Sequence, residues 1–400
     1  MASALPLSNI RIIELANVVA GPSVGKHLSD FGAQVTKIER PGDGDAARAM
    51  GELIGDRSAW WLSIGRNKQS VTLDLKQPKG REALLRLVEG ADALVESFRP
   101  GVLERLDLSP DVLRAVNPGL VVVRVSAFGQ TGPYSQRPGF GTLAEAFGGL
   151  AEISGYPGQS PLLASFALAD EVAGLFATWA LLVALYHRDV GEERGEGQVI
   201  DVSLFESVFN ILGPLPTLYK ASGALQERNG SRLPWSSPRN VYRTRDGHHF
   251  AVSGTTQAAA DTILRLIGGD DLVADPRFST PDARVRNAEE LDAVVSRWIA
   301  ERDVADVDRC FQKAGAAGVR VLSMADVFED PQYRARGTLL EVEDEALGTV
   351  HMAAPVPRMS ATPSRVTHVG PPLGHDTEDI LAELGYCSEE IADGRSEGAW

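Results

Sequence analysis

The sequence predicts an α/β protein made of a Rossmann-like large domain with a parallel sheet and a smaller α+β domain. Three observations support this fold class. The chain opens with a strand, a turn, a helix and a second strand, and further helix–strand units follow. Beyond about residue 240, a hairpin signal and consecutive helical segments replace that alternation. The length of 400 residues also suits two or three domains.

The elements of the large domain follow from local patterns. Alternating apolar residues from Ile10 to Leu15 predict a strand, and Ala20-Gly21-Pro22 predicts the turn after it. The predicted elements are a strand at 10–15, a helix at 23–31, a strand at 34–39, a helix at 79–89, strands at 93–95 and 120–125, a helix from about 170 to 188, a strand at 199–202 and a helix from 204. Strands separated by helices are typical of a parallel sheet.

The smaller domain follows a linker at 222–240 that is rich in glycine and proline. Asp246-Gly247 stands between two short apolar runs and predicts a β-hairpin, and helices are expected at 257–267, 288–301, 303–314 and 376–384. We therefore expect a large domain at 1–200, a linker helix at 201–225, the small domain at 226–325, and a return segment at 326–400 that completes the large domain.

Composition excludes several classes of protein. The formal net charge of −15 opposes binding to nucleic-acid phosphates. Cys310 and Cys387 cannot build a disulfide framework or a metal cage, so we expect a cytoplasmic location and no metal. Residues 1–7 lack the pattern of an export signal, and the longest apolar run, 172–185, is shorter than the roughly 18 residues that span a bilayer. We expect no membrane partner.

Three motifs resemble known sites but lack a required feature. The segment 21–27 follows a strand as a phosphate loop does, but its spacing is one residue short, and His27 replaces the Ser or Thr that binds magnesium. Glu39 stands where a dinucleotide fold places its ribose ligand, yet the turn before it holds one glycine where three are needed. His248 and His249 would point to opposite faces of a strand, so they cannot chelate one ion.

Asp170, at the entry of the long apolar helix, has two interpretations. Aspartate is a favoured N-cap, worth about 1 kcal/mol. Alternatively, its carboxylate faces the positive end of the helix dipole among the small residues Ala169, Ala173 and Gly174, and stays ionised and approachable. With an ordinary pKa of about 3.9 it is a nucleophile at pH 7 without a base, and it can attack an activated acyl carbon to form an anhydride.

Four blocks of the sequence together resemble the class III CoA-transferases, the family of formyl-CoA and carnitine CoA-transferases. The blocks are LSDFGAQVTKIERPG at 28–42, RNKQSV at 66–71 with VESFRPGV at 95–102, VSAFGQTGPY at 125–134, and DEVAG at 170–174 with GEGQVIDVSL at 195–204. The Asp246-Gly247 hairpin and PLGHDT at 372–377 extend the resemblance toward the C-terminus. Each block alone is weak evidence, but their order and spacing together are specific.

The resemblance implies a reaction, a cofactor and an assembly. Asp170 would attack an acyl-CoA thioester to give an aspartyl-acyl anhydride and then an aspartyl-CoA thioester, from which an acceptor carboxylic acid takes the CoA. Coenzyme A would bind as the acyl-CoA co-substrate, and two subunits would interlock into a homodimer. The residues expected to contact CoA are Val19, Ala20, Arg40, Arg66, Asn67, Lys68, Gln69, Ser97, Phe98, Arg99 and Arg105.

Two departures from the family pattern concern the site itself. Ser97 stands where relatives often have asparagine, and Gly141 replaces an acidic residue found in some relatives. The substrates are not specified by the sequence. Succinyl-CoA is a common donor in the family, and either Arg232 or Arg239 is a candidate ligand for a second carboxylate.

Two other functions stay open for the same fold. An α-methylacyl-CoA racemase would pair Asp170 with a histidine near Phe140, but the sequence has no histidine between His27 and His187. A CoA-binding regulator without turnover would retain the arginines and use Asp170 only as a helix cap.

Overall fold

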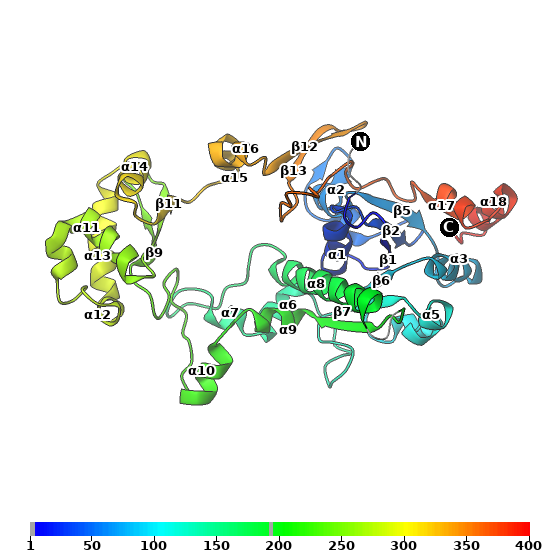
Figure 1. Cartoon of the computed structure of the whole chain (residues 1–400), viewed down its shortest axis with the longest axis horizontal. Coiled ribbons are helices and arrows are strands. Elements are labelled where there is room, and N and C mark those ends of the chain that lie inside the picture. The colour runs from blue at the N-terminus through cyan, green and yellow to red at the C-terminus, as the bar shows by residue number, and fades with distance from the viewer. Residues whose placement is uncertain (1–4, 192–194) are drawn as a thin grey trace. The chain divides into compact units, whose positions relative to one another are not determined.

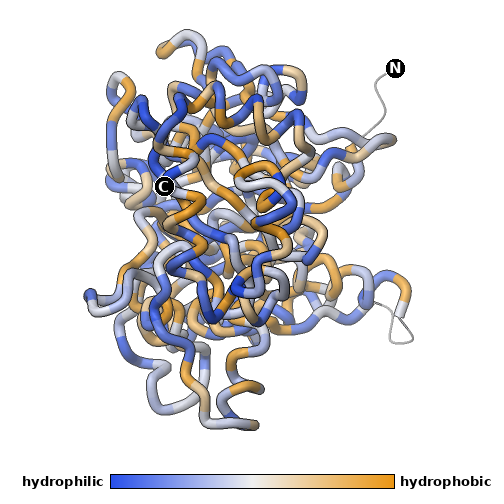
Figure 2. The backbone as a smooth tube through the Cα atoms, turned by 90° about the vertical axis from the view of Figure 1, so that its left-hand side faces the viewer, coloured by the Kyte–Doolittle hydropathy of each residue, from blue (hydrophilic) through white to orange (hydrophobic). Residues whose placement is uncertain are grey.

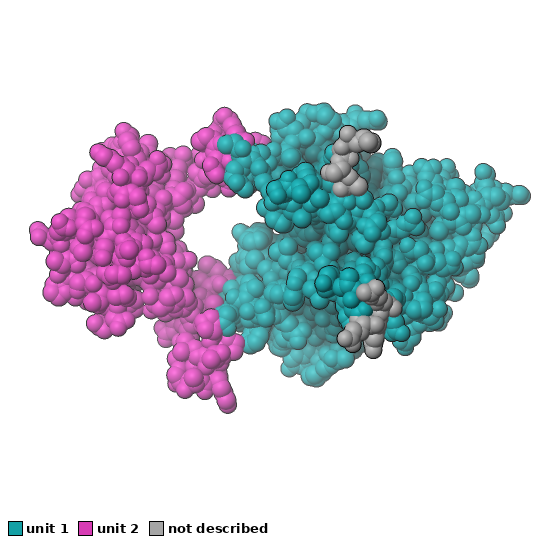
Figure 3. Space-filling model, viewed as in Figure 1, with its two compact units in different colours: residues 1–150, 163–213, 335–400 teal, residues 151–162, 214–334 magenta. Residues whose placement is uncertain are grey.

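The structure is a computed structural model that describes residues 5–191 and 195–400. Residues 1–4, part of the segment on which the absence of an export signal was predicted, lie outside this description. The chain forms two compact units (Figure 3): unit 1 comprises residues 1–150, 163–213 and 335–400, and unit 2 comprises residues 151–162 and 214–334. Residues 151–162, assigned from the sequence to the large domain, therefore belong to unit 2.

A six-stranded sheet with the order β5-β2-β1-β6-β7-β8 forms the centre of unit 1. Every pairing in it is parallel, which confirms the predicted fold class. Its strands are β1 (Arg11–Glu14), β2 (Gln34–Glu39), β5 (Lys68–Thr72), β6 (Ala93–Glu96), β7 (Val121–Ser126) and β8 (Val199–Ser203). The strand order changes direction at β1 and β6, and open sheets of this kind bind ligands beyond the carboxyl ends of such strands.

Helices cover both faces of this sheet, because successive side chains along a strand point to opposite faces. Ile12 and Val123 belong to the core of one face, whereas Ile13 and Val122 belong to the core of the other. The first core includes helices α1 (Ala20–Ser29), α6 (Gly141–Phe147), α8 (Leu168–Val190) and α9 (Leu204–Asn210); the second includes α3 (Pro78–Glu89), α4 (Val102–Arg105), α5 (Pro110–Val116), α17 (Thr377–Glu383) and α18 (Ser388–Ser396). In Figure 1, α8 runs across the sheet in green, and α17 and α18 are red.

The long helix α8 packs along α1, β7 and β8. Ala173, Ala177 and Leu181 form part of its buried side, while Trp179 and Tyr186 on another side are 65% and 71% exposed. By length and composition alone, α8 could also cross a membrane. The prediction of a buried helix is therefore correct for one face of α8 only.

Unit 2 has its own core around an antiparallel sheet of order β11-β10-β9. The predicted hairpin is confirmed, since β9 pairs with β10 on either side of Asp246-Gly247. The elements of this unit include β9 (Arg239–Arg243), β10 (His249–Ser253), β11 (Gly318–Arg320), α10 (Leu215–Ser222), α11 (Gln257–Ala274), α12 (Pro281–Arg286), α13 (Ala288–Ala300), α14 (Val304–Ala314) and α15 (Met324–Glu329). Two short helices span the limits between the units, α7 (Leu150–Ile153) and α16 (Pro331–Ala335).

The C-terminal segment returns to unit 1 and closes its second core. The Asp376 carboxylate accepts a hydrogen bond from the backbone of Ser70 on β5 at 2.7 Å, and the buried Trp400 indole donates to the carbonyl of Ile391 at 2.8 Å. The remaining elements of unit 1 are β3 (Leu53–Ile54), β4 (Arg57–Ser58), β12 (Leu339–Asp344), β13 (Gly348–Ala353), α2 (Ala59–Ile64) and the 3-10 turn η1 (Ala46–Ala49). Figure 2 shows that apolar stretches in orange alternate with polar stretches in blue along the backbone.

Candidate active site

Asp170 lies in the first turn of α8 and does not cap it. The N-cap residue is Ala167, and no side chain caps this helix end. Because Leu168 is the first helical residue, Asp170 is the third, close to the unpaired N–H groups and the positive end of the helix dipole. The interpretation of Asp170 as an N-cap is therefore wrong, and its presence needs another explanation.

The Asp170 carboxylate fills the space beside Gly141, the first residue of α6. A Cβ atom added at Gly141 would lie 2.1 Å from Oδ2 of Asp170, far below the 3.0 Å under which real Cβ contacts essentially never occur. The glycine that departs from the family pattern thus makes room for this carboxylate. The small residue Gly174 has a different role, because a Cβ there would lie 2.7 Å from the Cβ of Ser23 on α1.

Burial changes the ionisation of Asp170. It raises the pKa to about 6; a hydrogen bond from its own backbone opposes the rise, and the negative charges of Glu171 and Glu145 add to it. The expectation of an ordinary aspartate pKa is therefore corrected. At pH 7 about nine-tenths of the carboxylate is still ionised. A more basic carboxylate is also a stronger nucleophile, so this environment favours covalent chemistry.

Glu171, the neighbour of Asp170, is neutralised by two basic side chains of α1. Lys26 Nζ lies 3.2 Å from one of its carboxylate oxygens, and His27 Nε2 lies 3.8 Å from the other. Although burial opposes ionisation, these two partners lower the pKa of Glu171 to about 2. The pair therefore fixes the first turn of α8 to α1, and Asp170 has no ion-pair partner among the residues that the structure describes.

A cavity of about 790 Å³ lies beside the carboxyl ends of β1, β2, β5 and β6. Three of the predicted CoA contacts, Arg40, Phe98 and Arg105, line it together with Lys76. Arg105 and Lys76 are exposed, and neither forms an ion pair within the described chain. Free cations around a partly apolar crevice at this position suit a nucleotide that carries phosphates.

The loop between β1 and α1 forms one wall of this crevice. Asn17 lines the cavity, and its backbone N–H donates to Ser97 Oγ at 2.9 Å. Val18 adopts a φ of 71°, which is unfavourable for a β-branched residue, and its N–H donates to Asp45 at 2.9 Å. Two fixed side chains thus hold a strained loop at the ligand-binding edge.

The start of α1 connects the crevice with α8. Val19 and Ala20 are both buried there. A Cβ added at Gly21 would lie 3.4 Å from Ser97, and one added at Gly174 would lie 3.0 Å from the carbonyl oxygen of Ala20. This helix start therefore touches the wall of the crevice on one side and the second turn of α8 on the other.

The predicted phosphate ligands Arg66 and Lys68 do not line the crevice and are held in buried ion pairs. Arg66 is 5% exposed and pairs with Asp30 at 2.5 Å. Lys68 is 1% exposed, lies 2.8 Å from Glu14 and donates to the Pro22 carbonyl at 2.7 Å. Burial lowers the pKa of Lys68 to about 8, against the opposing charge of Glu14. The structure corrects both assignments, because both cations neutralise buried carboxylates.

The other predicted contacts are dispersed. Asn67 donates to the carbonyl of Arg365 at 2.8 Å, and Gln69 accepts from Thr36 at 3.2 Å. Arg99 is exposed but is not among the residues that line the crevice. The structure therefore gathers Arg40, Phe98 and Arg105, with Ser97 behind them, and separates them from the segment 66–69.

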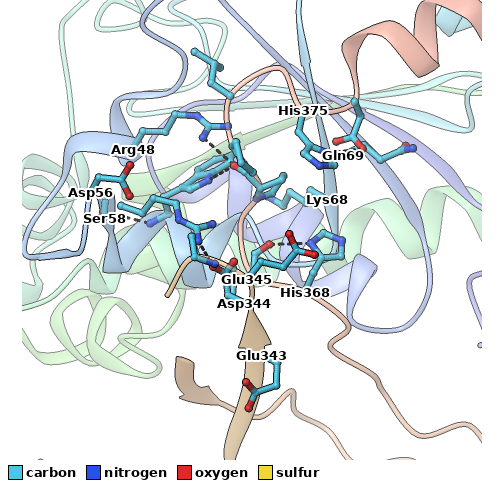
Figure 4. A pocket seen from close by; sticks show the side chains of 18 residues that line it. Arg48, Asp56, Ser58, Lys68, Gln69, Glu343, Asp344, Glu345, His368 and His375 are labelled. Atoms are coloured by element: carbon cyan, nitrogen blue, oxygen red, sulfur yellow. Dashed lines mark hydrogen bonds and ion pairs between the residues drawn. The ribbon is translucent and has the colours of Figure 1, made fainter. Parts of the chain in front are cut away.

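A second cavity in unit 1, of about 830 Å³, is less suited to phosphates (Figure 4). Its arginines are already engaged: Arg48 pairs with Glu39 at 2.7 Å and Arg57 pairs with Asp344. Its lining also contains the carboxylates of Asp56, Glu343, Asp344, Glu345 and Asp376. Because these charges repel anions, we assign the CoA site to the crevice at the strand ends.

The two arginines proposed to bind a second carboxylate, both in unit 2, differ in availability. Arg232 is paired with Asp292 at 2.6 Å. Arg239 donates to the carbonyl of Ser231 at 2.6 Å and lines a cavity of about 550 Å³ without an ion-pair partner among the described residues. Arg239 is therefore the better candidate.

Sequence reasoning missed Lys76 and Glu145. Lys76 follows the resembling block 66–71 by five residues and lines the crevice with Leu73, Asp74 and Leu75. Glu145 gave no signal, since an acidic residue in a short helix is ordinarily solvated. No group of three or more His, Cys, Asp or Glu that could hold a metal occurs in the part of the chain that the structure describes.

A doubly wound sheet with a cation-lined crevice and a nearby unneutralised carboxylate defines an α/β enzyme of the nucleotide-cofactor-binding class. Comparison with known proteins makes this specific: the chain belongs to CoA-transferase family III, which it matches over residues 7–377. The predicted resemblance is thereby confirmed. The protein is an enzyme of the class III acyl-CoA:carboxylate CoA-transferase type, with CoA thioesters as co-substrates.

Relatives and a solved structure match over almost the whole chain. The chain is 37% identical over 389 residues to succinyl-CoA–D-citramalate CoA-transferase of Chloroflexus aurantiacus, covering 97% of this chain and 96% of that one. It is 39% identical over 392 residues to the succinyl-CoA–L-malate CoA-transferase alpha subunit of the same organism, covering 97% and 91%. A CaiB/BaiF family protein from Brucella suis superposes with a TM-score of 0.84 at 31% identity, covering 96% of this chain and 100% of that one.

Proposed function

We propose that the protein transfers CoA from succinyl-CoA to a second dicarboxylic acid through covalent intermediates on Asp170. The observation that carries the proposal is the Asp170 carboxylate itself, which is partly buried, unneutralised and accommodated by Gly141. Asp170 is not the N-cap residue of α8, although its carboxylate accepts a hydrogen bond from its own backbone N–H. The names of the relatives supply the substrate class, since they pair succinyl-CoA with citramalate or malate.

The reaction on Asp170 balances without an external proton donor. An Asp170 oxygen bonds to the thioester carbon, the carbon–sulfur bond breaks, and CoA thiolate leaves behind an anhydride. The thiolate then attacks Cγ of Asp170, which releases the donor acid and leaves an aspartyl-CoA thioester. The acceptor carboxylate attacks the same Cγ, and the expelled thiolate returns to the acceptor's acyl carbon. Asp170 is regenerated as a carboxylate, and the thioester energy is conserved.

The crevice would hold the nucleotide end of CoA during these exchanges. Lys76 and Arg105, unpaired within the described chain, supply cations for its phosphates, and Arg40 supplies a third that would leave its exposed partner Asp43. Phe98 supplies an apolar surface for adenine. The start of α1 would guide the pantetheine arm, because it touches both the crevice wall and α8.

We further propose a cytoplasmic homodimer whose subunits cover the exposed apolar side of α8. Leu175, Trp179, Val183 and Tyr186 recur every three or four residues and are more than half exposed. Trp179→Glu should convert a dimer into a monomer in light scattering, whereas Val112→Glu at a separate surface position should not. A wild-type mass of one subunit, or wild-type protein that floats with liposomes, would contradict this assignment.

The cytoplasmic location is supported by the free Cys310 and Cys387, which are consistent with a reducing compartment.

Intact-mass measurement after incubation with a panel of acyl-CoAs tests the catalytic proposal. Succinyl-CoA should give an acyl or CoA adduct that hydroxylamine removes and that peptide mapping places on Asp170. Asp170→Asn should give no adduct but should still bind CoA. Exchange of deuterium into the α-carbon of a 2-methylacyl-CoA, with no adduct, would support the racemase instead. Binding without either reaction would support the regulator.

A further inference from the structure

Glu145 is a buried carboxylate that the proposed reaction does not use. It lies on α6 and is 3% exposed. A carboxylate so far removed from water needs partners, because desolvating a charge is costly. No Lys, Arg or His forms an ion pair with Glu145 in the described chain. Its recorded partner is the backbone N–H of Ala164, which donates to Oε2 at 2.8 Å.

The position of Glu145 directs it toward Asp170. Residues four apart share one side of a helix, so Glu145 lies on the same side of α6 as Gly141. Gly141 in turn touches Oδ2 of Asp170. In agreement with this geometry, the charge of Glu145 is one of the causes that raise the pKa of Asp170.

The hydrogen bond to Ala164 links Glu145 to the same helix start. Ala164 precedes Leu168, the first residue of α8, by four residues, in a segment without regular secondary structure. Since no side chain caps α8, the bond from Glu145 is an anchor for the chain that leads into the first turn. Glu145 is therefore connected to the start of α8 by this hydrogen bond as well as by its charge.

Other charged groups on and around α8 already have partners. On α8 itself, Glu171 is paired with Lys26 and His27 of α1. On the other elements packed against α8, Arg124 of β7 is paired with Glu96 and Glu104. The carboxylates of Asp201 on β8 and Glu206 on α9 accept hydrogen bonds from the backbone of Gln130 and from the Ser203 hydroxyl. Of the two carboxylates whose charge acts on Asp170, Glu171 is paired and Glu145 has no counter-ion among the described residues.

We propose that Glu145 is a positioning residue, which anchors the segment before α8 and sets a fixed negative charge against Asp170 that strengthens it as a nucleophile. The inference rests on the proposed function, because it assigns a role relative to covalent reaction at Asp170. The effect of the Glu145 charge on Asp170 can be measured without turnover, because a nearby like charge favours the protonated form of a carboxylate.

Two substitutions separate the two actions of Glu145. Glu145→Gln removes the charge, but its amide oxygen can still accept from Ala164, so this variant should fold as the wild type does. Glu145→Leu removes both. Glu152→Gln on α7 is the matched control, because it removes one negative charge from a side chain that is 72% exposed.

The readout is the pH titration of the Asp170 carboxyl carbon, followed by NMR in protein that carries carbon-13 in its aspartate side chains. The resonance of Asp170 is the one that disappears in Asp170→Asn. Glu145→Gln should lower the midpoint by a few tenths of a pH unit, because burial is the larger cause of the raised pKa, and Glu152→Gln should leave it unchanged. The rate of adduct formation with succinyl-CoA at pH 8 should fall several-fold in Glu145→Gln and further in Glu145→Leu.

An unchanged Asp170 midpoint in Glu145→Gln would overturn the proposal. The same holds if the labelling rates of Glu145→Gln and Glu145→Leu equal the wild-type rate. Failure of the wild type to form any adduct would instead refute the proposed function, and the NMR midpoint would still decide whether Glu145 acts on Asp170.

Discussion

Gly141→Ala tests whether the Asp170 carboxylate must occupy its observed position. The added Cβ would lie 2.1 Å from Oδ2, and an ordinary contact begins near 3.4 Å, so the oxygen must move by about 1.3 Å. Misplacing a reacting group by about 1 Å can cost roughly a hundredfold in rate. We therefore expect adduct formation on Asp170 to slow by about two orders of magnitude.

The substitution should leave the rest of the protein unaffected. Gly141 has an ordinary helical conformation at the start of α6, where alanine is a better helix former than glycine. Neither Gly141 nor Asp170 lines the CoA crevice, so the CoA affinity measured by calorimetry should stay the same. Thr142→Ala, at the adjacent exposed position, is the matched control and should react as the wild type does.

The assay is the rate of the mass increase with succinyl-CoA, measured with the thermal midpoint of each variant. If Gly141→Ala formed the adduct at the wild-type rate, the reasoning would be refuted, because the reactivity of the Asp170 carboxylate would then not depend on the space beside Gly141. A Gly141→Ala protein that loses CoA binding as well would also refute it, since the effect would not be confined to Asp170.

Three further predictions concern charge. The pKa of Asp170 is about 6 in the folded state and about 3.9 in the unfolded state, so the free energy of unfolding falls as pH rises between these values. Asp170→Asn should therefore raise the free energy of unfolding by about 1–2 kcal/mol at pH 7.5 and leave it unchanged at pH 3.5. The rate of adduct formation by the wild type should decline below about pH 6, where Asp170 becomes protonated. Arg105→Ala should raise the KM for acyl-CoA about tenfold with kcat nearly unchanged, and the exposed Lys313→Ala should change neither; an equal effect of both would contradict the crevice assignment. Lys68→Met should lower the urea-unfolding free energy by about 2 kcal/mol, because Glu14 loses one charged hydrogen bond but keeps its pair with Lys37 at 3.0 Å. The CoA affinity of the folded protein should not change, and weaker CoA binding at full stability would restore the predicted role of Lys68 as a ligand.

Local sequence patterns were sufficient for the architecture. The strand predicted at 34–39 is β2, and the helices predicted at 79–89, 288–301 and 303–314 are α3, α13 and α14 within a residue. Such elements are readable because periodicities of 2 and 3.6 residues report which side of a segment is buried. The short helices α6 and α18 were missed, because a few turns carry too little periodic signal.

The roles of the charged residues could not be read in the same way. Lys68 and Arg105 both resemble phosphate ligands in the sequence, yet Lys68 neutralises Glu14, 54 positions away, and Arg105 has no ion-pair partner in the described chain. Pairing between distant residues depends on which strands become neighbours, and that order is a property of the whole fold. Burial then decides which cations a ligand can reach.

The sequence by itself determined the α/β architecture, the membership of the family and the identity of Asp170 as the candidate nucleophile. Only the tertiary structure decided that Asp170 is not a cap, that Gly141 makes room for it, and that burial raises its pKa to about 6. The physical reason is that helix and strand periodicity act over a few neighbouring residues. Desolvation and steric contact at Asp170 instead depend on α6, whose residues are distant in the sequence and adjacent in space.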